Sequence, residues 1–304
     1  MDGSARDNQA FFTVMFSDDL WREIKKHIYP GKKKGTWYRW GGDGDVAAFY
    51  GYLPLMKSRK HLIYTIEAMD FAAAEGHLEV VKWLHFNRAE GCTTWAIDDA
   101  AAEGHLEVVK WLHFNRKEGC TTRAMDLAAM NGFLDVIRWL HSNRPEGCTK
   151  YAANRAAENG HLEVVKFLHE NRKEGRTTNA MDFAAGNGHL QVVKWLHENT
   201  NEGCTDNAMD WAAENGYLDV VKWLYENKTE GCTTMAMNWA AENGNLKVVK
   251  WLHDNRTEGC TTWAMDCAAS SGYLEVVKWL HFNRTEGCTT VSYTHLTLPT
   301  TPYV

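Results

Sequence analysis

The sequence lacks an excess of basic residues and any long apolar run. Its 304 residues contain 33 Lys and Arg against 39 Asp and Glu, which gives a formal net charge of -6. A basic face for the phosphate backbone of nucleic acid is therefore not expected. No stretch approaches the roughly 18 uninterrupted apolar residues of a membrane helix, and the opening MDGSARDNQ is no secretory signal peptide. We expect an intracellular, cytoplasmic protein with no nucleic-acid partner and no membrane partner.

Signatures of catalysis are also missing. The sequence has no Walker-type phosphate loop and no glycine-rich dinucleotide fingerprint, and its Asn-Gly and Glu-Gly pairs are typical of turns. Asp70, His85 and a nearby threonine could be arranged as a hydrolytic triad. Versions of them recur in every repeat described below, however, whereas a catalytic site needs one specialised cleft. We predict no enzyme activity, no cofactor and no small-molecule substrate.

A unit of 28 residues recurs eight times without a gap. Each copy reads approximately A-M-D-x-A-A-E-N-G-H-L-E-V-V-K-W-L-H-x-N-R-T-E-G-C-T-T-x, and the array ends near Val291. The run A-M-D-x-A-A ends at Asn-Gly, and L-E-V-V-K-W-L-H ends at a polar turn, which predicts two short helices per unit. The copies begin at Ala68, Ala96, Ala124, Ala152, Ala180, Ala208, Ala236 and Ala264.

Side chains around both helices are given structural roles. A threonine before each first helix, such as Thr93, can cap its N-terminus, and the acidic residue of the first turn, such as Asp98, complements the helix dipole. The second helix carries apolar groups on more than one stripe, as expected between two neighbouring repeats. Its outward residues Glu79 and Lys82 form a solvated charged pair. The recurrent tryptophans, from Trp83 to Trp279, are predicted to pack between repeats.

The unit A-M-D-x-A-A-x-x-G-H-L-E-V-V-K-W-L resembles the ankyrin repeat, whose corresponding stretch runs T-P-L-H-x-A-A-x-x-G-H-x-x-V-V-x-L-L. The likeness covers residues 68–291. It implies an all-α fold, a curved solenoid of stacked helix-turn-helix repeats that binds other proteins. Ala-Met-Asp replaces Pro-Leu-His, and the unit is shorter than the family's repeat of about 33 residues. R-T-E-G-C-T-T stands where a long β-hairpin finger would be, so we expect the fingers to be shortened or absent.

Seven of the eight cysteines occupy one equivalent position per repeat, which suggests zinc ligands or disulfides. Pairs such as His85 and Cys92, or His113 and Cys120, are separated by a turn and lack the short paired spacings of structural zinc sites. Equivalent residues of neighbouring units are expected about 10 Å apart, the distance between packed helices. That distance exceeds the roughly 7 Å limit for a disulfide. We predict free, partly buried thiols and no metal.

Three segments flank the array. Residues 1–42 are predicted to be an N-terminal helical segment, and the amphipathic stretch 16–28 resembles the start of an F-box, a motif that recruits ubiquitin ligases. Residues 43–67 align with the core of a repeat and are interpreted as a degenerate N-terminal capping repeat. Residues 292–304 depart from the repeat abruptly. Their run VSYTHLTLPT resembles the translation of a sequencing adapter and is excluded from fold reasoning.

Comparison of the eight copies separates constant positions from variable ones. In the first helix the variable positions are the residue before the first alanine, the third after it and the sixth. At 100° per residue these fall within about 60° of arc, and the near-constant positions fill the opposite side. The variable positions carry aromatic, charged and amide groups, which are typical of protein-recognition surfaces. We assign partner binding to Trp95, Asp99, Arg123, Met130, Tyr151, Arg155, Glu158, Asn179, Asn207, Trp211, Glu214, Met235, Trp239, Glu242 and Trp263.

The predicted function is a scaffold that binds an unidentified partner protein through this variable face. Aromatics such as Trp211, Trp239 and Trp263, expected to be exposed, argue against a surface that is merely unconstrained. Two alternatives remain open. The chain could be a substrate adaptor of a ubiquitin ligase through its N-terminal segment, or a duplicated array with no specific ligand, because recent duplication explains the uniformity of the copies without function.

Overall fold

The chain is built from short helices joined by tight turns. The computed structural model describes residues 43–174, 177–227 and 231–289, and the regular elements in these ranges are all helices. The all-α prediction is therefore confirmed for this part of the chain. A first compact unit, Met1–Cys120, contains α3 (Asp43–Phe49), α4 (Leu53–Ser58), α5 (Glu67–Ala74), α6 (Leu78–Asn87), α7 (Trp95–Ala102) and α8 (Leu106–Asn115).

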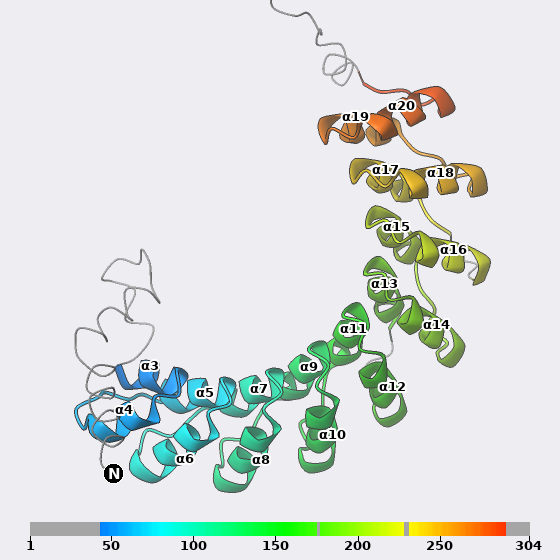
Figure 1. Ribbon diagram of the computed structural model, residues 1–304. Helices are drawn as coiled ribbons and strands as arrows, with labels where there is room; N and C mark the ends of the chain where they lie inside the picture. Colours follow the sequence, from blue (N-terminus) through cyan, green and yellow to red (C-terminus); the bar gives the residue numbers. More distant parts are fainter. Residues whose placement is uncertain (1–42, 175–176, 228–230, 290–304) are drawn as a thin grey trace, which may run out of the picture. The chain divides into compact units, whose positions relative to one another are not determined.

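A second compact unit, Thr121–Val304, contains the remaining six helix pairs (Figure 1). Each pair is one 28-residue repeat, so the predicted helical hairpin per repeat is confirmed. The helices are α9 (Thr122–Met130), α10 (Leu134–Asn143), α11 (Lys150–Glu158), α12 (Leu162–Asn171), α13 (Asn179–Gly186), α14 (Leu190–Asn199), α15 (Asn207–Glu214), α16 (Leu218–Asn227), α17 (Thr234–Glu242), α18 (Leu246–Asn255), α19 (Thr262–Ser270) and α20 (Leu274–Asn283).

Neighbouring repeats pack through helices of the same kind. In the first unit α3, α5 and α7 lie side by side, and α4, α6 and α8 form a second row. In the second unit the first helices, α9 to α19 in odd numbers, lie along the inner side of its arc, and the second helices lie along the outer side (Figure 1). Each unit is therefore a stack of helix pairs, as the repeat predicted.

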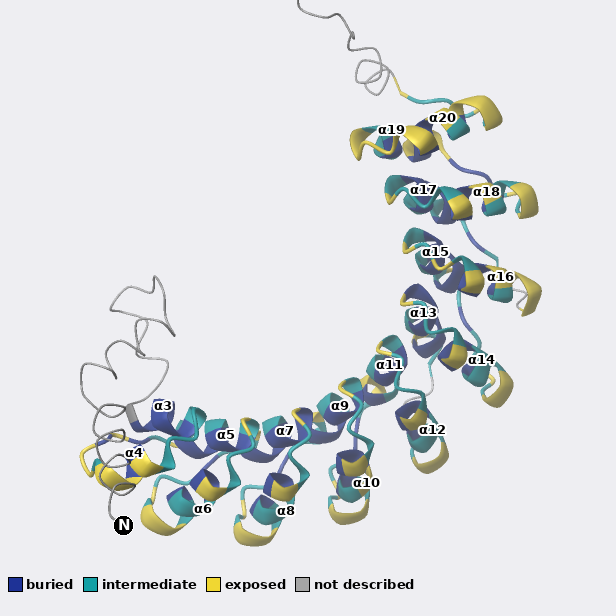
Figure 2. Ribbon diagram, viewed as in Figure 1, coloured by how far each residue is buried: buried dark blue, intermediate teal, exposed yellow. Residues whose placement is uncertain are grey.

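The buried side chains of the first helices are mostly small, and those of the second helices include β-branched valines. Ala212 and Ala213 of α15 are fully buried, as are Val220 and Val221 of α16. Burying one Val or Leu side chain stabilises the fold by about 1.5–3 kcal/mol, and the pattern recurs in every repeat. Buried residues face the neighbouring helix pair, while the far ends of the second helices are exposed (Figure 2).

A helix pair precedes the first 28-residue repeat. Ala47 of α3 is fully buried, and α3 packs against α5. Asp45 of α3 accepts hydrogen bonds from the backbone N–H of Thr65 at 2.8 Å and from its hydroxyl at 2.9 Å. A ring nitrogen of His77, in the next repeat, lies 3.0 Å from the carbonyl oxygen of Phe49. Thr65 lies just before α5, so the Asp45–Thr65 bonds within residues 43–67 and the His77–Phe49 contact with the first repeat are of the same kinds as those between the later helix pairs.

The connections between repeats contain no hairpin fingers in the described residues. The loop between α6 and α7, residues 88–94, is a short turn without a strand, and the described parts of the equivalent loops are alike. The expectation of shortened or absent fingers is confirmed for these loops. The N-terminal segment 1–42, with its F-box-like stretch 16–28, and the tail 292–304 lie outside the described residues.

Gly188 and Gly272 have the same backbone conformation but different surroundings, so alanine substitutions at the two positions separate the cost of overpacking from the cost of backbone strain. Both end a first helix with φ of +79°, which glycine adopts freely. A Cβ at Gly188 would lie 2.5 Å from the Tyr217 ring of the next repeat, whereas a Cβ at Gly272 would meet no atom within 4 Å.

We therefore expect Gly188→Ala to lower the free energy of unfolding by about 2–4 kcal/mol, of which about 1 kcal/mol is strain and the rest is overpacking against the ring. Gly272→Ala should cost only the strain, about 1 kcal/mol. Urea unfolding followed by circular dichroism measures both. Equal losses for the two variants would contradict close packing at the Gly188 turn.

Candidate functional site

A buried Asp or Asn in one first helix is bonded to the threonine that precedes the next first helix. Asp210 of α15 is buried and accepts hydrogen bonds from the backbone N–H of Thr233 at 2.9 Å and from its hydroxyl at 2.6 Å. The Thr233 hydroxyl in turn accepts from the N–H of Met235 at 3.0 Å, which caps α17. One threonine therefore both caps its own helix and joins it to the preceding repeat.

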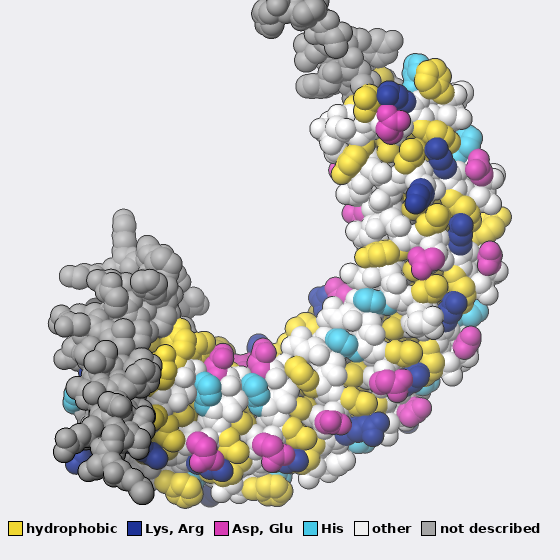
Figure 3. Space-filling view, in the orientation of Figure 1, with side chains coloured by type: hydrophobic (Ala, Val, Ile, Leu, Met, Phe, Trp, Pro, Cys, Tyr) yellow, Lys and Arg dark blue, Asp and Glu magenta, His cyan; other side chains and the backbone are white. Residues whose placement is uncertain are grey.

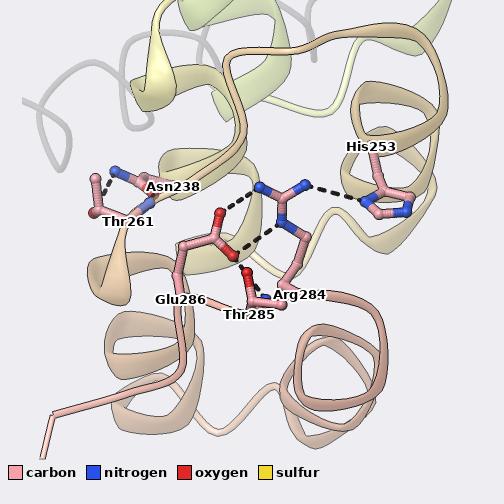
Figure 4. Close-up of polar contacts among 6 residues, drawn as sticks. All are labelled: Asn238, His253, Thr261, Arg284, Thr285 and Glu286. Carbon is pink, nitrogen blue, oxygen red and sulfur yellow. Dashed lines mark hydrogen bonds and ion pairs between the residues drawn. The ribbon is translucent and has the colours of Figure 1, made fainter.

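The same contact recurs with other residues at these positions. Asp70 binds Thr93, and Asp182 binds Thr205, each through two hydrogen bonds of 2.7–2.8 Å. Figure 4 shows the version at Asn238, whose Oδ1 accepts from the N–H of Thr261 at 3.0 Å while its Nδ2 donates to the hydroxyl.

The threonine caps predicted from the sequence are confirmed at Thr93, Thr121, Thr149, Thr205, Thr233 and Thr261. The larger role of the acidic position was missed. Asp98, assigned to the helix dipole, is only 1% exposed. The available signal was the constant separation of 23 residues between the Asp or Asn and the threonine.

A second contact joins the loops that follow the second helices. Arg284 lies between Glu286, to which Nε donates at 3.2 Å, and His253 of the preceding repeat, whose Nδ1 is 3.3 Å from Nη1 (Figure 4). In the first unit Arg116 pairs with Glu118 and approaches Nδ1 of His85 at 3.4 Å. These charged side chains are therefore paired with groups of the stack itself.

Aromatic rings also stack from repeat to repeat along the second helices. The ring of His169 meets that of Trp195 edge-on at 5.3 Å between centroids, and His253 meets Trp279 at 5.1 Å. The prediction that the tryptophans pack between repeats is confirmed for these pairs. Farther out, Lys166 pairs with Glu163 at 2.7 Å. In the first unit acidic and basic side chains adjoin in the same way over α6 and α8 (Figure 3), where Lys82 pairs with Glu79 as predicted.

The cysteines of the repeat are packed beside the loop arginines. Burial raises the pKa of the Cys92 thiol to about 12 and that of the Cys148 and Cys232 thiols to about 11. A raised pKa keeps the thiol protonated and a poor metal ligand or nucleophile. No cluster of three or more His, Cys, Asp or Glu suited to a metal ion occurs among the described residues.

The Asp–Thr contacts and the buried alanines lie on one side of the first helices, and the opposite side carries the variable residues. In the first unit Trp95 is exposed and Asp99 half-buried on α7. In the second unit the other assigned residues lie on α9 to α19. Those that are exposed are Arg123, Tyr151, Asn179 and Trp263. Those that are partly exposed are Met130, Arg155, Glu158, Asn207, Trp211, Glu214, Met235, Trp239 and Glu242.

The large exposed aromatics expected at Trp211 and Trp239 need correction. Both are only partly exposed. Trp211 stacks on Phe183 of the preceding repeat, with 5.7 Å between ring centroids and 12° between planes. Gly186 makes room for it, because a Cβ there would lie 2.9 Å from Cβ of Trp211. Trp263, at 44% exposed, fits the expectation.

A row of side chains therefore follows the face from α11 to α15. The Arg155 guanidinium lies 5.8 Å from the centre of the Phe183 ring and pairs with Glu158. Phe183, which was not among the fifteen assigned residues, connects this cation to Trp211. The sequence placed Phe183 on the variable stripe, but only the structure shows the stacking.

The carboxylates farther along the face have no such cation. Burial raises the pKa of Glu214 above its ordinary value, and the charge of Glu242 in the next repeat adds to the effect. Nδ2 of Asn245 donates to the backbone oxygen of Glu214 at 2.7 Å, which fixes the helix end but leaves the carboxylate unpaired within the described residues.

One small pocket in the described part of the second unit lies between two repeats. A cavity of about 30 Å³ lies between the fourth and fifth repeats, next to His169, Arg172 and Thr200. Thr200 stands where most repeats have arginine, so the shorter side chain accounts for the space. About one water molecule would fill it. The accessible candidate site is the open helix face.

Comparison with known families agrees with the fold class defined above, a solenoid of helical hairpins. Residues 153–234 and 209–290 match a family described as ankyrin repeats (3 copies), and residues 97–141 match ankyrin repeats (many copies). The chain belongs to the ankyrin repeat family. No curated protein matches it. Ankyrin repeats are typically non-enzymatic modules for protein–protein interaction, and no helix in the described ranges is long and apolar enough to cross a membrane.

Asp210 is the position at which the contact between repeats is best tested. Asp210→Ala leaves the N–H of Thr233 without its acceptor and should lower the free energy of unfolding by about 1–3 kcal/mol. Asp210→Asn should change it by less than about 1 kcal/mol, because Asn238 makes the equivalent bonds in the next repeat. Urea unfolding at pH 7 measures both variants. A large loss for Asp210→Asn would show that the negative charge itself is required.

The pH dependence of the same pair has a definite sign. Burial raises the pKa of Asp210 despite the opposing hydrogen bonds from Thr233. The ionised carboxylate is therefore disfavoured in the folded state, and stability is gained as the pH falls through the folded pKa toward the ordinary value. Any advantage of Asp210→Asn over the parent at pH 7 should shrink as the pH is lowered through this range. An advantage that grows on acidification would contradict the raised pKa.

Thiol reactivity tests the burial of the cysteines. At pH 8 we expect Cys92, Cys148 and Cys232 in the native chain to react with iodoacetamide at least about a hundredfold more slowly than in urea, because the thiolate is the reactive form. Quenched alkylation followed by peptide mass spectrometry measures each site. Comparable rates in the folded and unfolded chain would show that these side chains are not buried as described.

Proposed function

We propose that this chain is a scaffold whose variable first-helix face, from α9 to α19, binds a partner protein. The observation that carries the proposal is that the two sides of each first helix differ in burial and in variability. One side, exemplified by Ala212, Ala213 and Asp210 of α15, is buried and bonded between repeats, whereas Trp211 and Glu214 reach solvent. The side that makes none of the Asp–Thr contacts is also the side that varies among the copies.

The composition of that face supports a role in partner recognition rather than an unconstrained solvent surface. Its partly exposed aromatic, arginine and methionine side chains belong to the types that dominate binding energy at protein interfaces. The contact of Trp211 with Phe183 also fixes its rotamer, so less side-chain entropy is lost on binding. The helices beneath are held in register by the Asp–Thr contacts, which makes the face a preorganised surface.

Partner capture with two matched variants tests the proposal. Tyr151→Ser with Trp263→Ser removes two aromatics from the face that are 56% and 44% exposed. Phe114→Ser with Phe282→Ser removes two aromatics at the ends of second helices that are 75% and 81% exposed. Neither pair should disturb the core, and equal urea midpoints would verify this.

Affinity purification with mass spectrometry should recover a protein with the parent and with the second-helix variant, and at least tenfold less of it with the face variant. A loss of about 1.4 kcal/mol in binding suffices for that ratio. Equal recovery by all three chains, or recovery of nothing by the parent, would contradict binding through this face.

A further inference from the structure

The charge on the first-helix face changes sign along the second unit. At one end the face carries Arg123 of α9 and Arg155 of α11, with Glu158 as the single carboxylate on that part of the face. On α13 the exposed and partly exposed side chains of the face are uncharged, because its one acidic residue, Asp182, is buried against Thr205.

Farther along, α15 and α17 carry carboxylates and no cation. Asp206, next to the start of α15, is exposed, and Glu214 and Glu242 are partly exposed at equivalent positions of successive repeats. Neither Glu214 nor Glu242 is paired with a cation in the described part of the chain. In the loop that follows α18, by contrast, Glu258 pairs with Arg256.

The chain contains an internal example of what such a glutamate can bind. In the fourth repeat the guanidinium of Arg155 pairs with Glu158 and also lies over the ring of Phe183 in the next repeat. A cation is thus held between a carboxylate of one repeat and an aromatic ring of the following one.

Two repeats later the carboxylate and the aromatic residue recur without the cation. Glu214 corresponds to Glu158, and Trp239 corresponds to Phe183, but Trp211 replaces the arginine. The positions around the missing guanidinium are therefore preserved in residue type. Burial of Glu214 and repulsion by Glu242 raise the pKa of Glu214, so a nearby positive charge would be favourable here.

We propose that the α15–α17 part of the face binds a basic peptide segment of the partner, with a Lys or Arg side chain held between Glu214, Glu242 and the ring of Trp239. The inference rests on the proposed function and specifies the chemistry of the partner. Carboxylates attract the cation, and the tryptophan face adds a cation–π contact. An acidic segment would be repelled here. The basic α9–α11 end of the face would repel the same basic segment, which fixes where along the face that segment binds.

Fluorescence anisotropy with defined peptides tests the proposal on the full chain. The probes are three labelled peptides of twelve residues, alternating Ser with Arg, with Gln or with Glu. Glu214→Gln with Glu242→Gln removes the two carboxylates. The matched control, Glu198→Gln with Glu226→Gln, makes the same change in net charge on exposed residues of α14 and α16.

We expect the Arg peptide to bind the parent at least tenfold more tightly than the Gln peptide, and the Glu peptide to bind most weakly. The Glu214 and Glu242 double variant should weaken Arg-peptide binding at least fivefold, while the control should change it less than twofold. Equal weakening by both variants, or no preference for the Arg peptide over the Gln peptide, would overturn the proposal.

A third variant distinguishes local binding of the cation from a long-range effect of the chain's net charge. Trp211→Arg copies the arrangement of the fourth repeat by supplying a guanidinium within the chain, next to Glu214 and Trp239. It should weaken binding of the Arg peptide at least fivefold. The matched control Gln191→Arg adds the same charge at an exposed position of the second helix α14 and should change binding less than twofold. Unchanged binding by Trp211→Arg, with an unchanged urea midpoint, would also overturn the proposal.

The failure of this inference can be told apart from failure of the proposed function. If the captured protein is lost with Tyr151→Ser and Trp263→Ser but the Arg peptide binds no better than the Gln peptide, the face is an interface whose partner is not basic. If no protein is captured through the face and peptide binding ignores Glu214 and Glu242, both proposals are wrong.

Discussion

The hydrogen bonds between a buried carboxylate or amide of one first helix and the threonine that precedes the next first helix are the contacts on which the array depends. They satisfy a backbone N–H at the start of first helices such as α17 and α19 and hold the buried Asp or Asn in one place. A buried acceptor left without donors costs about 1–3 kcal/mol, so the spacing and register of adjacent first helices follow from this pairing. Hydrophobic burial supplies most of the stability, but it is non-directional and would tolerate sliding.

Because the back of each first helix is fixed in this way, its front is free to vary without loss of the fold. The alanines allow close approach, and the Arg–Glu pairs and His–Trp contacts use the remaining polar and aromatic groups of the repeat inside the stack. What reaches solvent on the first helices is a row of side chains whose identity changes from repeat to repeat. A scaffold of this kind can alter its specificity by substitution at a few positions while its stability changes little.

The change of charge along the second unit shows how such variation creates chemistry. Arg155, Phe183 and Trp211 occupy the same position in successive repeats, so an internal cation, an aromatic ring and a second ring follow one another. Replacing the arginine by tryptophan removes the positive charge but keeps the glutamate beside it. The fourth repeat therefore pairs its own carboxylate with an arginine, whereas the carboxylate of the sixth repeat is partly buried and unpaired within the described residues.

The sequence by itself determined the repeat length, the two helices per repeat and the side of the first helix that varies, because period and turn residues are local signals. The assignment of tryptophans to packing followed from their regular recurrence. Only the tertiary structure decided that Asp210 binds Thr233, that Trp211 stacks on Phe183 and that Glu214 and Glu242 pair with no cation among the described residues. These contacts join side chains of neighbouring repeats, and the pattern within one repeat does not state which of its residues meet across the stack.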